Sequence, residues 1–252
     1  MTEPLVSFRN AGKIYENGTV ALAGLDLDVR RSEFLTLLGP SGCGKSTILR
    51  LIAGLDNVSS GTLTRDFELG HASIGFVFQD PTLMPWANVF DNVFLPLRLR
   101  GVARNEATPV VEEVLALVGL GAFTTAFPRE LSGGMRMRVS IARALVLRPP
   151  LLLMDEPFAA LDEITRFKLN DDLLALQGEL GTTIVFVTHS VFESVYLSTR
   201  IAVMAARGRA VAEIAIDAPS PRGRDFRTSS VYAHYCAQAS RALQRAMDED
   251  LT

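Results

Sequence analysis

Nine consecutive residues near the N-terminus have the types and the spacing that bind phosphate. They combine three glycines with a lysine and small polar side chains: Gly39, Pro40, Ser41, Gly42, Cys43, Gly44, Lys45, Ser46 and Thr47. Glycines let backbone N–H groups turn inward around an anion, and a lysine after the last glycine reaches the β- and γ-phosphates of a nucleotide. The Ser46 hydroxyl at this spacing binds Mg²⁺. We therefore predict a nucleotide-binding loop; the alternative is a glycine turn that caps a helix.

Two acids follow a short apolar run later in the chain. Asp155 and Glu156 come directly after residues 151–154, which resemble a buried strand. Ligands of α/β sheets bind at the carboxyl ends of the strands. Beside a phosphate loop, Asp155 would hold Mg²⁺ through its water shell, and Glu156 would accept a proton from the attacking water. The alternative is a helix N-terminus that attracts acids.

Two further polar residues end apolar runs in the same manner. His189 follows residues 183–187 by way of Thr188, and Gln79 follows residues 74–78. A histidine beside a γ-phosphate would serve catalysis, and an amide can touch both a metal ion and a water. Taken alone, a histidine at a strand end such as His189 is more often structural than catalytic, whereas Gln79 is equally compatible with a structural and a functional role.

The segments around these candidates predict the elements that position them. Residues 34–38 form an apolar run before the loop, residues 21–30 alternate like a strand, and residues 105–118 have helical periodicity that ends at Gly119. Farther along, short apolar runs alternate with helical stretches: 151–154, 163–180, 183–187, 191–197 and 201–205. This alternation predicts an α/β fold with a parallel sheet flanked by helices.

The composition narrows the class of protein. The chain has 252 residues, of which 48% are hydrophobic and 21% are charged, and its formal net charge is −3. These values are typical of a globular protein and offer no basic surface for nucleic acid. The apolar runs are too short to span a bilayer, and the two cysteines fit a reducing compartment. We therefore expect a cytosolic protein that binds no nucleic acid.

Residues 131–135, Leu-Ser-Gly-Gly-Met, distinguish this chain from other proteins with a phosphate loop. They resemble the signature motif of ATP-binding cassette (ABC) transporter subunits. The motifs of that family match in order over about residues 5–216: Tyr15, residues 39–47, Gln79, Ser132 with Gly133 and Gly134, Asp155 with Glu156, Asp162 and His189. The resemblance implies a P-loop NTPase core of the ABC type, with an N-terminal antiparallel β subdomain and a helical signature subdomain.

The resemblance also implies how these residues act. Two chains would enclose two ATP molecules head to tail, with ATP and Mg²⁺ as cofactors. Tyr15 would stack on adenine, Ser132 with its glycines would bind the γ-phosphate held by the opposite subunit, and Asp162 of the D-loop would belong to the nucleotide site. Metal binding would fall to Ser46, Gln79 and Asp155, and catalysis to Glu156, His189 and Gln79.

Within the family, the chain is most similar to ATPase subunits of bacterial importers of nitrate, sulfonates, taurine and pyrimidine precursors of thiamine. Residues 83–86, 131–136 and 188–194 carry this likeness. It implies a homodimeric ATPase, peripheral on the cytoplasmic side of the cell membrane, bound to permease subunits that a solute-binding protein supplies. The alternative is an ABC-type ATPase of a soluble machine, in DNA repair or iron–sulfur assembly. A small-molecule kinase is opposed by the signature motif.

We expect an ATPase domain over residues 1–216, with a helical subdomain over about 83–148, and a helical tail over 217–252. Two interpretations stay open for Phe90, Phe94 and Leu97. These side chains would either receive the coupling helix of a permease or pack in the core. The tail is amphipathic over 231–247 and is predicted to pack on the body.

Overall fold

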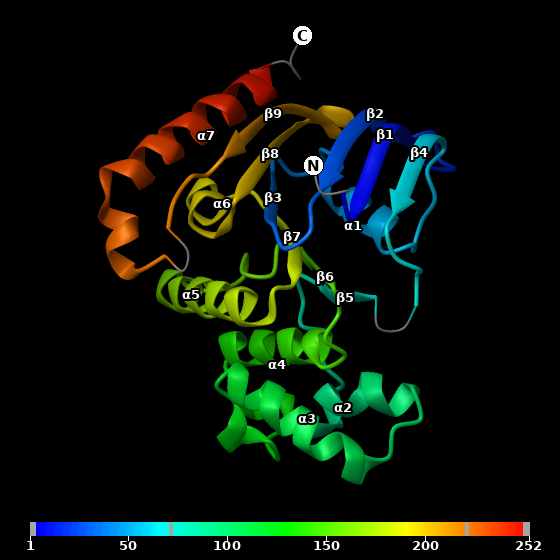
Figure 1. The fold of residues 1–252 in the computed structure, drawn as a ribbon, viewed down its shortest axis with the longest axis vertical. Helices are drawn as coiled ribbons and strands as arrows, with labels where there is room; N and C mark the ends of the chain where they lie inside the picture. Colours follow the sequence, from blue (N-terminus) through cyan, green and yellow to red (C-terminus); the bar gives the residue numbers. More distant parts are fainter. Residues whose placement is uncertain (1–3, 71–72, 220–221, 249–252) are drawn as a thin grey trace. The chain divides into compact units, whose positions relative to one another are not determined.

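The structure is a computed structural model that describes residues 4–70, 73–219 and 222–248. The chain divides into two compact units, and each is described by itself. The first contains Met1–Leu69 and Thr183–Thr252, and the second contains Gly70–Thr182. Figure 1 shows the elements in the colours of the sequence. None of the helices in the described part of the chain combines the length and the apolarity needed to cross a membrane.

The first unit contains an antiparallel sheet in the order β2-β1-β4. These strands span Val20–Val29, Val6–Ile14 and Ser60–Arg65. Leu25, Leu27 and Val29 are buried and alternate with more exposed residues, as expected for a sheet that packs one face against a core. The antiparallel β subdomain predicted at the N-terminus is therefore present.

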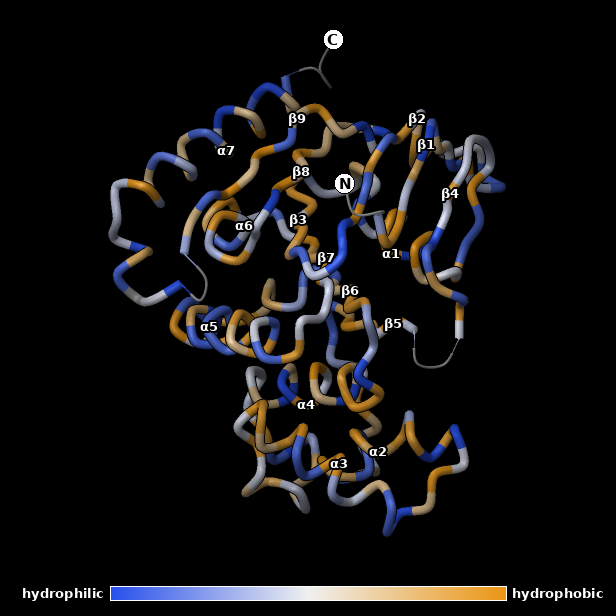
Figure 2. Tube along the Cα trace, viewed as in Figure 1, coloured by the Kyte–Doolittle hydropathy of each residue, from blue (hydrophilic) through white to orange (hydrophobic). Residues whose placement is uncertain are grey.

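Four further strands of the first unit lie in the order β7-β3-β8-β9. Their bounds are Thr183–Thr188, Phe34–Leu38, Arg200–Ala205 and Arg209–Ala215, and the short 3-10 helix η3 (Ala206–Gly208) joins the last two. The strands β7, β3 and β8 are parallel, and all their residues are buried. Burial on both faces explains why their sequences are continuous apolar runs. Figure 2 shows β3 and β8 mostly in the hydrophobic colour.

Three α-helices of the first unit flank these strands: α1 (Lys45–Ile52), α6 (Val191–Leu197) and α7 (Ser230–Asp248), with the 3-10 helix η4 (Arg224–Thr228) before α7. Helix α7 packs against α6, β8 and β9, and Figure 1 shows it running past α6. Its buried residues form one stripe: Tyr232, Cys236, Ala239 and Ala246. The amphipathic helix predicted over 231–247 is thus confirmed.

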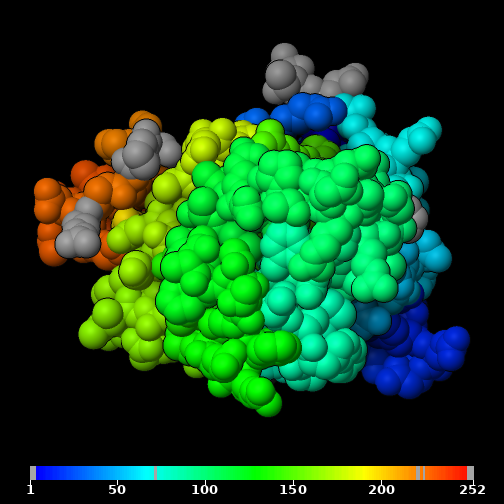
Figure 3. Space-filling model, turned by 90° about the horizontal axis from the view of Figure 1, so that it is seen from below, coloured from blue at the N-terminus to red at the C-terminus, as the bar shows by residue number. Residues whose placement is uncertain are grey.

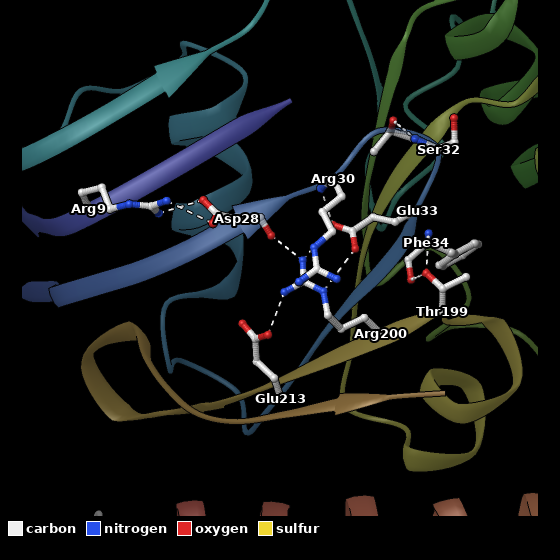
Figure 4. Close-up of polar contacts among 10 residues, drawn as sticks. Arg9, Asp28, Arg30, Ser32, Glu33, Phe34, Thr199, Arg200 and Glu213 are labelled. Atoms are coloured by element: carbon white, nitrogen blue, oxygen red, sulfur yellow. Dashed lines mark hydrogen bonds and ion pairs between the residues drawn. The ribbon is translucent and has the colours of Figure 1, made fainter. Parts of the chain in front are cut away.

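A buried arginine joins several segments of the first unit, as Figure 4 shows. Arg200, at the start of β8, forms ion pairs with Glu33 at 2.8 Å and with Glu213 of β9 at 2.9 Å. It also donates to the carbonyl oxygen of Asp28 in β2. The guanidinium therefore ties β2 to the start of β3 and to the β8–β9 hairpin.

The second unit contains the parallel strands β5 (Ile74–Val77) and β6 (Leu151–Asp155) together with a group of helices. The helices are α2 (Val89–Leu99), α3 (Arg104–Leu117), η1 (Gly121–Phe123), η2 (Pro128–Glu130), α4 (Gly133–Leu145) and α5 (Glu163–Leu180). Helix α2 packs on α3 and α4, and Figure 3 shows the surface of this part in green and blue-green. The domain boundaries given by the sequence stay a prediction.

Candidate functional site

The predicted phosphate loop connects β3 to α1 in the first unit. Gly42 and Gly44 have φ angles of 81° and 106°, in the left-handed region that favours glycine. A Cβ on Gly39 would lie 2.6 Å from the carbonyl oxygen of Met204, and a Cβ on Gly44 would lie 2.6 Å from that of Ala21. The loop therefore leads bare backbone into the N-terminus of α1, as an anion-binding loop requires.

Lys45, the first residue of α1, folds its side chain back over this loop. Its Nζ donates to the carbonyl oxygens of Gly39 at 2.8 Å and Pro40 at 2.7 Å, and the residue is only 4% exposed. A buried ammonium group requires polar partners, and these two carbonyl oxygens supply them. The positive charge is consequently held at the loop predicted to bind phosphate.

Tyr15 and Thr47, two other predicted residues of the nucleotide site, meet beside the loop. Tyr15 follows β1 directly, and its hydroxyl lies 3.2 Å from Oγ1 of Thr47 on α1. The Nζ of Lys13 lies 5.2 Å from the centroid of the tyrosine ring, a distance at which a cation is attracted to the ring face. These contacts hold the aromatic ring next to α1, on which Ser46 is exposed.

His189 lies at the end of the strand next to the loop. The strands β3 and β7 are parallel, and Leu38 pairs with Thr188. The next residues along the two strands are Gly39, which begins the loop, and His189, which is exposed. The sheet register therefore brings His189 to the same edge as the phosphate loop.

In the second unit, Gln79, Asp155 and Glu156 lie at the ends of two paired strands. Val77 of β5 pairs with Met154 of β6, so Gln79 and Glu156 each follow a paired residue by two positions. Glu156 has a φ of 46°, a conformation that non-glycine residues rarely adopt. Such local strain clusters at functional sites, where the surrounding structure maintains it. The two acids and the amide are thus brought to one edge of this strand pair.

The signature residues and Asp162 also lie together in the second unit. Ser132 caps α4 by accepting from the N–H of Met135 at 3.2 Å, and Asp162 caps α5 by accepting from the N–H of Thr165 at 2.9 Å. The N–H of Thr165 lowers the pKa of Asp162. A Cβ on Gly134 would lie 2.5 Å from Cγ2 of Thr165, so a glycine lets the two helix N-termini approach. The N-terminus of α4 has no acidic residue in its first turn and is suited to an anion, whereas the Asp162 carboxylate already caps α5.

Sequence reasoning missed Arg143, which holds the loop that follows Gln79. Arg143 of α4 donates to the carbonyl oxygens of Pro81 and Thr82, each at 2.9 Å. Burial lowers the pKa of this guanidinium. Thr82 has a φ of 47°, so the arginine fixes a strained turn. An arginine in the middle of a helix belongs to no recognisable motif, and its carbonyl partners are distant in sequence. The sequence pattern therefore does not indicate this role.

Burial decides between the two interpretations of Phe90, Phe94 and Leu97, a receptor for a permease helix or a part of the core. These residues are 8%, 6% and 8% exposed, and the rings of Phe90 and Phe94 lie 6.0 Å apart between centroids. They pack in the core of the second unit. The proposal that they receive a permease helix is therefore wrong.

Another face of α2 lines a groove in the second unit. Leu95, Pro96 and Leu99 form one wall of a cavity of about 420 Å³, together with Phe78 and Arg143. Leu99 is 77% exposed and Phe78 is 42% exposed. Trp86, in the segment before α2, is 78% exposed. The second unit therefore presents large exposed apolar side chains, of which Phe78 and Leu99 line the groove, and such exposure is typical of a protein interface.

The predicted Mg²⁺ ligands fit a metal that arrives with a nucleotide. The described residues contain no group of three or more His, Cys, Asp and Glu side chains that could hold a metal ion. The predicted donors are instead one hydroxyl, one amide and one carboxylate, from Ser46, Gln79 and Asp155. Mg²⁺ prefers oxygen and commonly takes one or two carboxylates with substrate phosphates and waters. The chemistry of this donor set matches that preference.

Comparisons with known proteins find relatives that all belong to one family. A family model described as ABC transporter matches residues 22–159. The chain is 42% identical over 247 residues to an aliphatic sulfonates import ATP-binding protein of Pseudomonas syringae, which covers 98% of this chain and 99% of that protein. It is 46% identical over 201 residues to a taurine import ATP-binding protein of Rhizobium johnstonii, which covers 78% of this chain and 77% of that protein.

Solved structures with the same fold include a bacterial ABC transporter cassette in a dimeric form. It matches with a TM-score of 0.74 and 33% identity, over 85% of this chain and 100% of that one. A second dimeric structure of that cassette is in a post-hydrolysis state bound to ADP and Pi. The predicted fold class is thereby confirmed.

Proposed function

The chain belongs to the ABC transporter family of ATP-binding proteins, and from this we propose that it is the ATP-hydrolysing subunit of a bacterial importer of a small solute. The observation that carries the proposal is the glycine loop between β3 and α1, where Lys45 is held by Gly39 and Pro40. Such a loop binds the phosphates of ATP. An ATPase of a soluble machine is disfavoured, because the relatives are named as import proteins.

The proposed reaction transfers the γ-phosphoryl group of ATP to water. Lys45 and the N–H groups of the loop bind the phosphates, while Glu156 accepts the proton of the attacking water. His189 donates a hydrogen bond to the γ-phosphate and stabilises its developing charge. Mg²⁺, held by Ser46, Gln79 and Asp155, would supply charge neutralisation at the phosphates. Tyr15 stacks on the adenine.

The active form is proposed to be a homodimer that encloses two ATP molecules. Ser132, Gly133 and Gly134, with Asp162, would serve the ATP bound by the other subunit. Support comes from the exposed Ser132 at the N-terminus of α4, which has no acidic residue in its first turn and is suited to an anion. The N-terminus of α5, which Asp162 caps, lies next to it. A relative of this fold is described as a dimer.

The groove lined by Leu95, Pro96 and Leu99 is the proposed docking site for a cytoplasmic helix of the permease. Its exposed apolar walls match the apolar face of an amphipathic helix. The subunit would then lie peripherally on the cytoplasmic face of the cell membrane. Leu99→Asp should abolish co-purification with the co-expressed permease and leave ATP hydrolysis by the isolated subunit unchanged. Retained co-purification would exclude this groove.

The proposed solute is small and polar, such as nitrate, a sulfonate, taurine or a pyrimidine. The named solutes of the relatives support this class. A separate solute-binding protein would deliver it to the permease. The ATPase activity is tested on the purified chain without these partners.

The test of the ATPase activity is release of inorganic phosphate from MgATP by the purified chain. Glu156→Gln keeps the size of the side chain but removes the proton acceptor, so turnover should fall by roughly 10²-fold or more. ATP should then trap a dimer, which size measurement detects. Glu112→Gln on α3 is the matched control, because Glu112 is exposed and outside the site. Parental turnover in Glu156→Gln would remove this residue from its role.

A further inference from the structure

The C-terminal tail holds the last turn of α6. Arg222 is 8% exposed, and its guanidinium donates to the carbonyl oxygens of Val195 at 2.8 Å and Ser198 at 2.6 Å, and also to that of Tyr196. The hydroxyl of Tyr196 donates back to the carbonyl oxygen of Arg222 at 2.9 Å. The last carbonyls of a helix lack intrahelical partners, and the arginine supplies donors for them.

The same tail also holds the first turn of α6. Tyr232 of α7 donates its hydroxyl to the carbonyl oxygen of Phe192 at 3.0 Å. At the last turn, the guanidinium carbon of Arg227 lies 3.6 Å from the ring centroid of Tyr196, which is itself buried. Figure 1 shows α7 passing along α6. Helix α6 is only seven residues long, and these contacts hold both of its ends.

The first turn of α6 is in turn bonded to the residues on both sides of His189. The hydroxyl of Thr188 donates to the carboxylate of Glu193 at 2.6 Å, and the N–H of Ser190 donates to Oγ1 of Thr188 at 3.0 Å. The N–H of Glu193 donates to the hydroxyl of Ser190 at 3.3 Å. These hydrogen bonds therefore make the position of the backbone at His189 depend on the position of α6.

We propose that the C-terminal tail positions His189 for catalysis, with Arg222 and Tyr232 as positioning residues that act through α6. This inference rests on the proposed function, because it uses the role of His189 at the γ-phosphate. Burying an arginine beside carbonyl groups is costly, and burial lowers the pKa of Arg222 to about 10. The described structure places this buried charge where it fixes the helix that follows His189.

The test uses the full chain with Tyr232→Phe, which keeps the ring and removes the hydroxyl, and with it the hydrogen bond to Phe192 and an interaction with Cys236 of the same helix. Tyr235→Phe is the matched control, because Tyr235 lies on the same helix and its hydroxyl accepts from the N–H of Asp217 instead. We expect kcat for ATP hydrolysis to fall about fivefold in Tyr232→Phe, as for one lost hydrogen bond, with KM unchanged. Tyr235→Phe should keep the parental kcat, and equal kcat in all three proteins would overturn the proposal.

A second measurement separates positioning from a general structural role. Arg222→Gln should lower kcat in the parent but not in a His189→Ala background, because the tail then has no histidine to position. An equal loss in both backgrounds would overturn the proposal. Tyr232→Phe in the same two backgrounds gives this comparison if Arg222→Gln does not fold.

Failure of the proposed function is recognised independently of the tail. If the parent does not hydrolyse ATP, the NMR signals of the histidine side chains, measured without nucleotide, still test whether the tail affects His189. The chain has three histidines, and the signal lost in His189→Ala identifies His189. Its NMR shift should change in Tyr232→Phe and stay constant in Tyr235→Phe. An unchanged His189 signal in Tyr232→Phe would overturn the role of the tail whatever the activity.

Discussion

The ammonium group of Lys45 lies 2.8 Å from the carbonyl oxygen of Gly39. This hydrogen bond connects the residue at the start of α1 to the first residue of the phosphate loop. This contact gives one side chain two functions. It closes the loop by neutralising two carbonyl dipoles, and it keeps a positive charge where phosphates are proposed to bind. The shape of the loop and its charge are therefore coupled in a single residue.

Lys45→Ala should abolish tight binding of MgATP and leave the rest of the fold intact. The variant loses the charge that pairs with the phosphates, whereas the core of β3 and α1 is apolar and independent of it. Isothermal titration with MgATP measures the loss, and circular dichroism monitors the fold. Lys168→Ala on α5 is the control, because Lys168 is exposed. Binding as tight as in the parent would show that the loop is not the site.

Arg200→Met should destabilise the protein by about 3 to 5 kcal/mol, because it leaves the carboxylate of Glu33 buried without its ion-pair partner. The two side chains are 7% and 8% exposed. Arg148→Met is the matched control: Arg148 pairs with Glu113 at 2.7 Å, but these side chains are 62% and 51% exposed. An exposed pair contributes about 1 kcal/mol or less. Urea denaturation followed by circular dichroism compares the two, and similar midpoints would contradict the importance of burial.

We expect the protein to lose stability in acid, because the ionised carboxyl of Asp28 stabilises the folded state and becomes protonated there. Its hydrogen bond with Arg9 lowers the pKa of this carboxyl in the folded state. A lowered folded-state pKa means that Asp28 contributes stability above its ordinary pKa of about 3.9, and that this contribution is lost as the pH falls toward the lower value. Asp28→Asn should therefore lower the thermal midpoint at pH 6 more than at pH 3. A constant difference across this range would show that the ionised carboxyl does not contribute.

The sequence predicted those features that depend on local pattern. Buried strands such as β3 are continuous apolar runs, and the phosphate loop is confined to nine neighbouring residues. The inward face of α2 was not predicted, because Phe90 and Leu99 are both apolar and only packing decides which is buried. Arg222 was assigned only to a tail, since its partners are backbone carbonyls that any sequence possesses.

Ser132 offers a test of the head-to-tail dimer with mixed pairs of subunits. If Ser132 acts on the ATP of the other chain, pairing Lys45→Ala with Ser132→Arg leaves one composite site intact, whereas pairing the parent with the double mutant leaves none. If Ser132 acts within its own chain, the outcomes reverse. Both pairs contain the same two substitutions, so the loss of the Ser132 cap on α4, about 1 kcal/mol, is equal in each.

The measurement for these pairs is ATP occlusion in purified heterodimers, because occlusion reports binding at one composite site separately from the later steps of turnover. We expect one occluded ATP in the pair of single mutants and none in the pair of parent and double mutant. The serine at the N-terminus of α4 is exposed, so its hydroxyl is accessible to an ATP that a partner subunit is proposed to bind. Occlusion confined to the pair of parent and double mutant would exclude the head-to-tail arrangement.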